Sequence, residues 1–202
     1  MDEVTVLIPN YKHEYCIDEA WDSVYDQVRF VEIINDYPQM GKGFRLNTVM
    51  HRVETEWVNI HDADDVSAPN RFEICSKHFE DYDVIYHDTY VRPRLWIDGK
   101  PSAGWIVHRS REWDRESYKA VNYIAASSVI IRSEIAKKVK WVHNSYGQDW
   151  IWLNQVAELT DRFKYIPMPL LYYRGEYGFT NKLSWKSLRR VDLRRKIRSL
   201  TK

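Results

Sequence analysis

The chain has 202 residues, 44% of them hydrophobic and 29% charged, which is typical of a folded globular domain with an apolar core. Its formal net charge of +1 provides no strong field for nucleic acid or an anionic membrane. Cys16 and Cys75 have neither metal-ligand spacing nor a disulfide pattern, and each falls in an apolar helical pattern, so we expect two small core residues. No stretch reaches the roughly 20 apolar residues of a membrane span, and no leader pattern is present, so we expect a cytoplasmic protein.

The first 61 residues predict strands that alternate with helices. Short apolar runs rich in β-branched residues predict strands at 4–9, 30–35 and 56–61. Between them, apolar residues recur at helical spacing over 17–28 and 46–53. Alternating strands and helices favour parallel pairing through crossover helices. We therefore expect an α/β fold with a mostly parallel central sheet flanked by helices.

The rest of the chain predicts further elements of both kinds. They are a helix after Pro69 with the apolar face Phe72, Cys75 and Phe79, strands at 83–87, 121–132, 163–166 and 170–173, and a helix that opens at 147–149. Ser133 is predicted to cap a short helix. Between 88 and 118 the pattern fails, and we expect a long irregular excursion. We expect one domain, 1–183, with a basic amphipathic helix at 184–202 appended to it.

The segment from Arg189 to Lys202 is strongly basic, with Asp192 as its only acid. The first interpretation is the solvated face of the last helix. The alternative is a surface that contacts the phosphates of a nucleic acid or the headgroups of a membrane.

Three carboxylates follow the third expected strand within four residues: Asp62, Asp64 and Asp65. In open α/β sheets, ligands bind beyond the carboxyl ends of the strands. Neighbouring carboxylates repel one another unless a cation neutralises them, and oxygen ligands of this kind suit Mg²⁺, Mn²⁺ or Ca²⁺. A divalent cation held there could bind a diphosphate and stabilise its charge as it leaves. The alternative is a solvated acidic turn that caps the helix near Pro69.

Five segments of the chain carry a family resemblance when they are taken in order. They are 4–11 (VTVLIPNY), 41–47 (GKGFRLN), 62–65 (DADD), 147–150 (GQDW) and 166–174 (IPMPLLYYR). Together they resemble the family 2 glycosyltransferases, which have the GT-A fold. The resemblance implies a single GT-A-like, Rossmann-like domain that moves a sugar from a nucleoside-diphosphate sugar, with UDP-sugars favoured and with Mn²⁺ or Mg²⁺ as the metal.

The resemblance implies that one group of residues holds the donor nucleotide. Pro9, Asn10 and Tyr11 would border the nucleobase, and Asp36 would contact the base or the ribose. Lys42 would lie near the base or the phosphates.

A second group would carry the metal and the chemistry. Asp62 would bind ribose or metal, Asp64 would ligate the metal directly, and Asp149 would be the general base that takes the proton of the acceptor hydroxyl. A base in that position permits in-line displacement with inversion at the anomeric carbon. Asp149 also opens a helix after a glycine, where the positive end of the helix favours an ionised carboxylate, although an ordinary first-turn acid has the same pattern.

Three departures from the family pattern affect these assignments. Gln148 stands where the family usually has Glu. The turn at 35–38 (NDYP) differs from the usual paired acids, which puts the alignment of Asp36 in doubt. After Arg174 the family often places a histidine near the metal, whereas this chain offers Glu176 as the substitute.

Several other side chains have two interpretations each. His61 and His87 end expected strands and are predicted to be satisfied edge residues, with a ligand or catalytic role as the alternative. Trp105, Trp113 and Trp141 could either form a platform on which the acceptor stacks or pack in the core or on the surface. Arg92, Arg94, Arg109 and Arg111 could either bind an acidic acceptor or belong to a solvated loop.

The acceptor separates the functional hypotheses. The first is a saccharide, lipid-linked or small-molecule hydroxyl. The second is a hydroxylated nucleic-acid base, with phosphates contacted by 189–202. The third is an inactive nucleotide-sugar binding module, which only Gln148 suggests. A nucleotidyltransferase should show a glycine-rich phosphate loop after the first strand, and residues 10–13 do not form one.

Overall fold

The structure is a computed structural model that describes residues 1–174 except residues 12, 37, 39, 92–95, 98–99, 102–104 and 143–146. The helices are α1 (Ile17–Tyr25), α2 (Lys42–Val49), α3 (Arg71–Ser76), α4 (Arg115–Ala120), α5 (Ser133–Ala136) and α6 (Gln148–Ala157), with the 3-10 turns η1 (Met50–Arg52) and η2 (Ala126–Ser128). The main sheet contains β1 (Val4–Asn10), β2 (Phe30–Asn35), β3 (Trp57–Ile60), β4 (Val66–Ser67), β5 (Val84–Val91), β8 (Ile106–His108), β9 (Ile130–Arg132) and β10 (Phe163–Tyr173). A separate hairpin joins β6 (Trp96–Ile97) to β7 (Lys100–Pro101). The expected helix at 184–202 and Glu176 lie outside the described residues.

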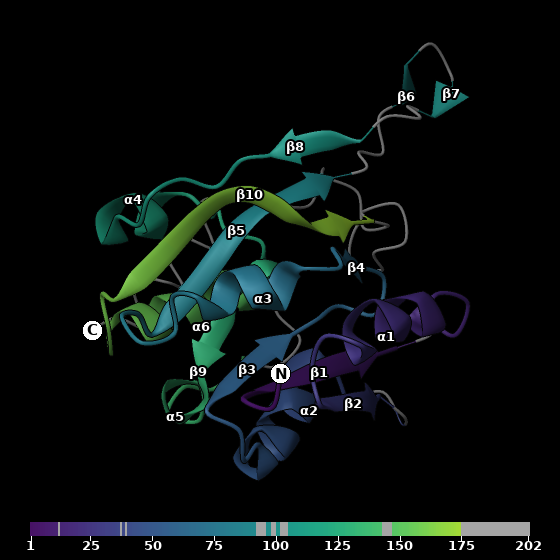
Figure 1. The fold of residues 1–202 in the computed structure, drawn as a ribbon, viewed down its shortest axis with the longest axis horizontal. Helices are drawn as coiled ribbons and strands as arrows, with labels where there is room; N and C mark the ends of the chain where they lie inside the picture. The colour runs from purple at the N-terminus through teal and green to yellow at the C-terminus, as the bar shows by residue number, and fades with distance from the viewer. Residues whose placement is uncertain are drawn as a thin grey trace.

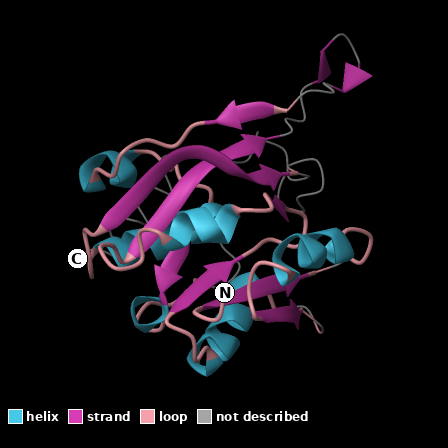
Figure 2. Ribbon diagram, viewed as in Figure 1, coloured by secondary structure: helices cyan, strands magenta, loops and turns pink. Residues whose placement is uncertain are grey.

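The main sheet is mostly parallel and is flanked by helices (Figures 1 and 2). Its strand order is β2-β1-β3-β9-β5-β10-β4, and β8 pairs with β5. β1 pairs in parallel with both β2 and β3. β9 lies antiparallel between β3 and β5, so β5 and its parallel partner β10 run in the direction of β3. The expected α/β architecture is confirmed.

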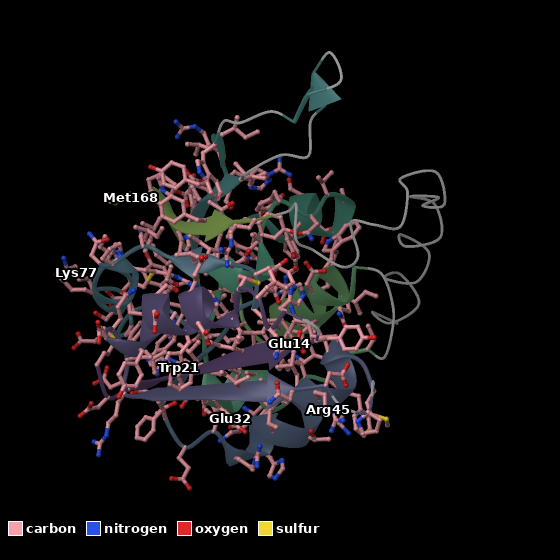
Figure 3. All side chains as sticks on the ribbon, turned by 90° about the vertical axis from the view of Figure 1, so that its right-hand side faces the viewer. Glu14, Trp21, Glu32, Arg45, Lys77 and Met168 are labelled. Carbon is pink, nitrogen blue, oxygen red and sulfur yellow. The ribbon has the colours of Figure 1, made fainter. Side chains whose placement is uncertain are left out.

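The parallel strands end at one edge of the sheet. Asn10 is paired with Asn35, and Leu7 is paired with Ile60, so β1, β2 and β3 finish close together. This edge lies toward the right of Figure 1 and faces the viewer in Figure 3. The residues that follow these strands therefore share one side of the domain.

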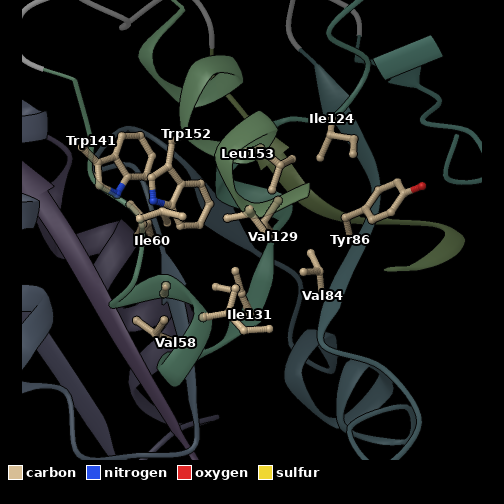
Figure 4. Packing of buried hydrophobic residues seen from close by; sticks show 14 of the residues in the cluster. Val58, Ile60, Val84, Tyr86, Ile124, Val129, Ile131, Trp141, Trp152 and Leu153 are labelled. Atoms are coloured by element: carbon tan, nitrogen blue, oxygen red, sulfur yellow. The ribbon is translucent and has the colours of Figure 1, made fainter. Parts of the chain in front are cut away.

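Two buried clusters hold the helices against the two faces of the sheet. One packs α6 over β3, β9 and β5 through residues that include Val58, Ile60, Ile131, Trp152 and Leu153 (Figure 4). The other packs α1 and α3 through residues that include Ile17, Val24, Phe72, Cys75 and Phe79. Each fully buried aliphatic or aromatic side chain contributes roughly 1.5–3 kcal/mol. Both cysteines are buried and free, as expected, although Cys16 precedes α1 as its N-cap residue.

The expected strand at 121–132 is wrong for most of its length. Val121 is half exposed at 50%, residues 126–128 form η2, and only Ile130–Arg132 is a strand. The turn forms because the backbone N–H and the hydroxyl of Ser128 both bond the carbonyl of Ala125, at 2.9 and 2.7 Å. Serine side chains that bond the nearby backbone favour turns over ladders.

Three smaller expectations are also corrected. Strands 163–166 and 170–173 are one strand, β10, whose pairing with β5 shifts register on both sides of Pro169. Proline cannot donate to a ladder, so the strand continues through an irregularity. Ser133 does not cap α5, because it is the first helical residue and Arg132 holds the N-cap position. The segment 88–118, expected to be irregular, contains the end of β5, the hairpin of β6 and β7, β8 and the start of α4.

Two of the three tryptophans considered as an acceptor platform are packing residues. Trp113 stacks on Phe163 with 3.7 Å between the ring centroids. The buried Trp141 stacks on Trp152 with 4.8 Å between the ring centroids (Figure 4). Trp105 is 40% exposed beside Tyr172, so for it the acceptor role stays a prediction. Within the described ranges, every helix is too short or too polar to cross a bilayer.

Candidate functional site

Lys42 lies at the centre of the candidate site, on the first turn of α2. Its ammonium forms an ion pair with Asp62, which directly follows β3 and His61. Burial lowers the pKa of Lys42, but the charges of Asp62, Asp149 and Asp64 raise it by more, so the net shift is upward. One cation thus faces three carboxylates that come from two distant parts of the chain.

The ion pair also controls the charge state of Asp62. Burial alone would raise the pKa of Asp62, but the charge and the hydrogen bond of Lys42 and the hydroxyl of Ser127 lower it below its ordinary value. The backbone N–H of Asp62 donates to Ser127 Oγ at 3.2 Å. Asp62 is therefore held as a carboxylate that points at Lys42.

Asp64 and Asp65 differ in what surrounds them. Burial and the charge of Asp62 raise the pKa of Asp64 to about 6, although the side chain keeps some contact with solvent. Asp65 is fully buried, and burial together with Asp64 and Asp62 raises its pKa well above the ordinary value. Its Oδ1 accepts the backbone N–H of Arg174 at 3.3 Å. Asp65 therefore holds the turn against Arg174, while Asp62 and Asp64 are partly exposed at the edge and could bind a ligand.

The donor set fits a hard divalent cation whose coordination shell is completed by a ligand. No group of three His, Cys, Asp or Glu side chains among the described residues could hold a metal alone. Mg²⁺ is usually bound by one or two carboxylates together with substrate phosphates, and not by a cage of protein ligands. Asp64 and Asp62 provide such carboxylates. Burial and then the charge of Asp62 raise the pKa of Asp64, and a bound cation would oppose both effects by favouring the ionised carboxylate.

Asp149 lies in the first turn of α6, and its charge acts on the same lysine. The helix opens after Gly147, whose φ of 69° lies in the left-handed region that favours glycine. No side chain caps this helix, so Asp149 is not its N-cap residue. Burial raises the pKa of Asp149, and Lys42 and the N–H of Trp150 oppose that shift without cancelling it.

A contact that the sequence does not reveal ties α2 to the chain before α6. The side-chain amide of Asn47 donates to the carbonyl of Trp141 at 2.9 Å and accepts the N–H of Trp141 at 3.0 Å. Lys42 lies over the ring of Trp141 at 5.6 Å. This clamp, formed by Asn47 and Trp141, brings the segment 41–47 next to the segment that presents Asp149.

Gly43 permits the close approach within this clamp. A Cβ at this position would lie 2.4 Å from the carbonyl oxygen of Val142 and 3.1 Å from Oε1 of Gln148. Glycine is required here by space, and Gln148 is a neighbour of the α2 backbone at this point.

Gly43→Ala should therefore destabilise the protein. The added methyl group must push the first turn of α2 away from Val142, and such overpacking typically costs about 1–3 kcal/mol. Urea unfolding should show this loss, while Thr48→Ala on the exposed side of the same helix should change the free energy of unfolding by at most about 0.5 kcal/mol. Equal stability of Gly43→Ala and wild type would contradict the close approach.

The residues expected to hold the nucleobase reach the same edge. Pro9 and Asn10 end β1, and Tyr11 follows them, partly exposed. The amide of Asn10 donates to Asn35 Oδ1 at 2.9 Å, and its oxygen accepts the N–H of His13 at 3.2 Å. The Asn10 side chain thus links the ends of β1 and β2 and the turn that follows β1. A contact of Asn10 with a base stays a prediction.

Asp36 is engaged within its own loop. It accepts the backbone N–H groups of Met40 and Gly41 at 2.7 and 2.8 Å and the Nε of Arg45 at 3.1 Å. Burial would raise the pKa of Asp36, but these bonds lower it. The carboxylate thus fixes the entry to α2, and a contact with base or ribose stays a prediction.

His61 and His87 are fully buried and neutral. Burial and the charge of Arg71 lower the pKa of His61 to about 3, and the same two causes hold that of His87 well below its ordinary value. His61 contacts the carbonyl of Asp62 at 3.0 Å and Ser67 Oγ at 3.1 Å. His61 follows β3 with both ring nitrogens engaged, in agreement with a satisfied strand-end residue. His87 departs from that expectation, because it lies within β5 and, although its Nδ1 lies 2.7 Å from the carbonyl oxygen of Asp88, its buried Nε2 has no hydrogen-bond partner among the described residues.

Arg174, at the end of β10, joins the acidic turn to α1. Its Nε donates to the carbonyl of Asp64 at 2.5 Å, and its guanidinium forms an ion pair with Glu19. The sequence gives no signal for this contact, because it depends on β10 and β4 pairing next to the turn.

Comparisons with known proteins bear on the fold. No family model matches the chain, and no curated protein matches it. S. aureus TarS 1-349 in complex with UDP-GlcNAc matches with a TM-score of 0.67 and 14% identity over 91% of this chain and 61% of that chain. M. tuberculosis glucosyl-3-phosphoglycerate synthase in complex with Mg²⁺ and UDP matches with a TM-score of 0.59 and 13% identity over 85% of this chain and 71% of that chain.

The fold is GT-A-like. A curled, mostly parallel sheet flanked by helices is common to this chain and its glycosyltransferase neighbours, and the expected fold class is confirmed. A further complex of the M. tuberculosis synthase holds Mn²⁺, UDP and glucosyl-3-phosphoglycerate, and it matches at 12% identity with a TM-score of 0.59 over 85% of this chain and 71% of that chain. The chain spans about 60% of the length of the TarS 1-349 structures. Membership of family 2 itself stays a prediction.

Proposed function

We propose that the protein is a metal-dependent glycosyltransferase that moves a sugar from a nucleoside-diphosphate sugar, preferably a UDP-sugar, to an acceptor hydroxyl. The observation that carries this proposal is the convergence of Asp62, Asp64 and Asp149 around Lys42 at the carboxyl edge of the sheet. The GT-A-like fold supports it, because the matched structures include complexes with UDP-GlcNAc and with UDP.

In this proposal the donor lies across the ends of β1 and β3. Pro9, Asn10 and Tyr11 border the nucleobase, and Asp36 contacts the base or the ribose. Lys42 turns from Asp62 toward the diphosphate, because both offer it negative charge at the same edge. The residues that approach the donor thus come from one continuous side of the domain.

Asp62 and Asp64 would hold a divalent cation, Mn²⁺ or Mg²⁺, together with the diphosphate. When bound, the cation would supply positive charge to the leaving nucleoside diphosphate. Asp149 takes the proton of the acceptor hydroxyl, the acceptor oxygen bonds the anomeric carbon, and the bond from that carbon to the diphosphate oxygen breaks. Attack opposite the leaving group inverts the anomeric configuration.

The acceptor class is proposed as a saccharide, lipid-linked or small-molecule hydroxyl. A hydroxylated nucleic-acid base and a peripheral membrane contact both depend on 189–202, outside the described residues. An inactive nucleotide-sugar binding module has less support, because the contact of Gln148 with Gly43 gives this departure a packing role.

The proposal is tested by incubating the protein with a panel of nucleotide sugars and either Mn²⁺ or Mg²⁺. We expect metal-dependent release of a nucleoside diphosphate from at least one UDP-sugar, through transfer or slow hydrolysis. Binding of a nucleotide sugar without turnover across an acceptor panel would favour the inactive module. Absence of any nucleotide or nucleotide-sugar binding would contradict the proposal.

Stability should depend on pH through Asp64. Its pKa is about 6 in the folded protein and 3.8 in the unfolded reference, so the folded state binds the proton more tightly. The stabilisation is complete below pH 3.8 and is lost as the pH rises through 6, by at most about 3 kcal/mol. In metal-free buffer, Asp64→Asn should therefore gain stability relative to wild type between pH 4.5 and 7.5, as measured by urea unfolding. Excess Mn²⁺ should remove that advantage, and a pH-independent difference would contradict the assignment.

A further inference from the structure

Arg71 is a buried charge beneath the acidic turn, on the first residue of α3. Its side chain is fully buried, and burial lowers its pKa to about 10, which leaves it charged at neutral pH. No ion pair with a carboxylate engages it among the described residues. A buried guanidinium is costly unless its N–H groups are bonded, so its contacts show what it serves.

One arm of the Arg71 network reaches the carbonyl of Asp62. Nη1 of Arg71 donates to Ser67 Oγ at 2.9 Å, and Ser67 Oγ lies 3.1 Å from Nε2 of His61. The other nitrogen of that ring, Nδ1, lies 3.0 Å from the carbonyl oxygen of Asp62. A carbonyl only accepts, so Nδ1 carries the proton, Nε2 accepts from Ser67, and Ser67 accepts from Arg71.

The second arm reaches the N–H of the same residue. Nη2 of Arg71 donates to the backbone carbonyl of Ser127, which also accepts the amide of Asn59 at 3.1 Å. Ser127 Oγ in turn accepts the backbone N–H of Asp62 at 3.2 Å. One guanidinium thus fixes both peptide groups of Asp62, through elements far apart in the sequence.

We propose that Arg71 is a positioning residue that holds Asp62 in the orientation required to meet Lys42 and the donor diphosphate. The proposal rests on the proposed function for its consequence in binding, but the hold on the Asp62 backbone stands apart from any ligand. Arg71 is itself fully buried and bonds Ser67 and Ser127 directly, so it acts on the edge only through the backbone of Asp62.

Arg132 provides a matched control at the opposite edge of the sheet. It is the last residue of β9, paired with Trp57 at the start of β3. It also makes several contacts: Asp83 at 3.2 Å, the carbonyl of Phe79 at 2.7 Å and an ion pair with Glu56. Arg132→Lys therefore removes a forked guanidinium of comparable connectivity without touching the acidic turn.

The experiment compares Arg71→Lys with Arg132→Lys by amide hydrogen exchange and by UDP affinity in Mn²⁺. Lysine keeps the charge but cannot bond Ser67 and Ser127 in a fixed fork. At matched global stability, we expect exchange at the N–H of Asp62 to accelerate at least about tenfold in Arg71→Lys alone. UDP affinity should fall by at least about tenfold in the same variant, since Asp62 is no longer fixed.

The outcomes separate the two proposals. Unchanged exchange at Asp62 in Arg71→Lys would overturn the positioning role, and so would accelerated exchange with wild-type UDP affinity. If the wild type binds no UDP, the proposed function fails, while the exchange comparison still decides the hold on Asp62. If Arg71→Lys does not fold, Ser67→Ala cuts one arm and should accelerate exchange at Asp62; no acceleration there would overturn the network.

Discussion

Asp149→Asn is expected to lower turnover by about 10²- to 10⁴-fold, the usual contribution of a general base, while binding of the UDP-sugar stays within a few-fold of wild type. Asparagine has nearly the same shape but cannot accept the proton of the acceptor hydroxyl. The measurement is single-turnover transfer, with donor affinity determined separately by calorimetry. A loss confined to turnover would assign Asp149 to the chemical step and leave the donor site intact.

The same substitution should stabilise the fold at neutral pH. Burial raises the pKa of Asp149, so the ionised form is held in the folded protein at a cost that asparagine does not carry. Asp114 is the matched control, because its carboxylate caps α4 by accepting the N–H of Ser117 at 2.8 Å. Asparagine caps a helix as well as aspartate does, so Asp114→Asn should change neither stability nor turnover.

Two results would contradict this assignment. If Asp149→Asn keeps turnover within tenfold of wild type, Asp149 is an ordinary acid of the first turn of α6. If Asp149→Asn loses donor binding together with turnover, the carboxylate acts on the nucleotide or on Lys42, and another group must take the acceptor proton.

The part of the fold before Asp62 follows closely from its sequence. The run 4–9 is apolar and β-branched because β1 is buried and is paired on both sides, by β2 and by β3. The run 30–35 forms the edge strand β2, which pairs with β1 alone, and no competing pattern interrupts either run. The acidic cluster could be placed at the sheet edge for the same reason, since only the end of a strand had to be located.

The secondary structure after the acidic cluster is harder to predict from the sequence, because tertiary contacts override the local pattern there. The run 121–132 is as apolar as a strand, but Ser127 and Ser128 turn the chain, and the carbonyl of Ser127 is bonded by Asn59 and Arg71. The sequence predicts two strands in place of β10, because prolines usually interrupt a strand. Pairing with β5 keeps β10 continuous past these prolines. Neither outcome is encoded within a short window of residues.

The contacts that support the site also cannot be predicted from the sequence. Asn47 and Trp141 are 94 residues apart, so only the folded chain shows that they clamp α2 to the segment before Asp149. Arg71 resembles an exposed helical arginine in the sequence, and its complete burial shows that it belongs to the acidic turn. Polar side chains that support a site carry no periodicity, so pattern analysis passes over them.

Asp64→Asn is expected to weaken UDP binding in Mn²⁺ by about 10- to 100-fold, because a charged contact to the metal and diphosphate contributes roughly 1.5–3 kcal/mol. Without metal, the substitution should not weaken UDP binding, so calorimetry with and without Mn²⁺ separates the two effects. Asp22→Asn, an exposed acid on α1, removes the same charge and should leave both affinities unchanged.

This experiment also distinguishes a metal site from an acidic turn. In the metal site, the loss appears only with Mn²⁺ present, because Asp64 acts through the cation. In a solvated acidic turn, Asp64→Asn would strengthen UDP binding by removing a negative charge near the diphosphate, with or without Mn²⁺. The sign of the change therefore decides between them: Asp64 either recruits the charge that binds the diphosphate or only repels it.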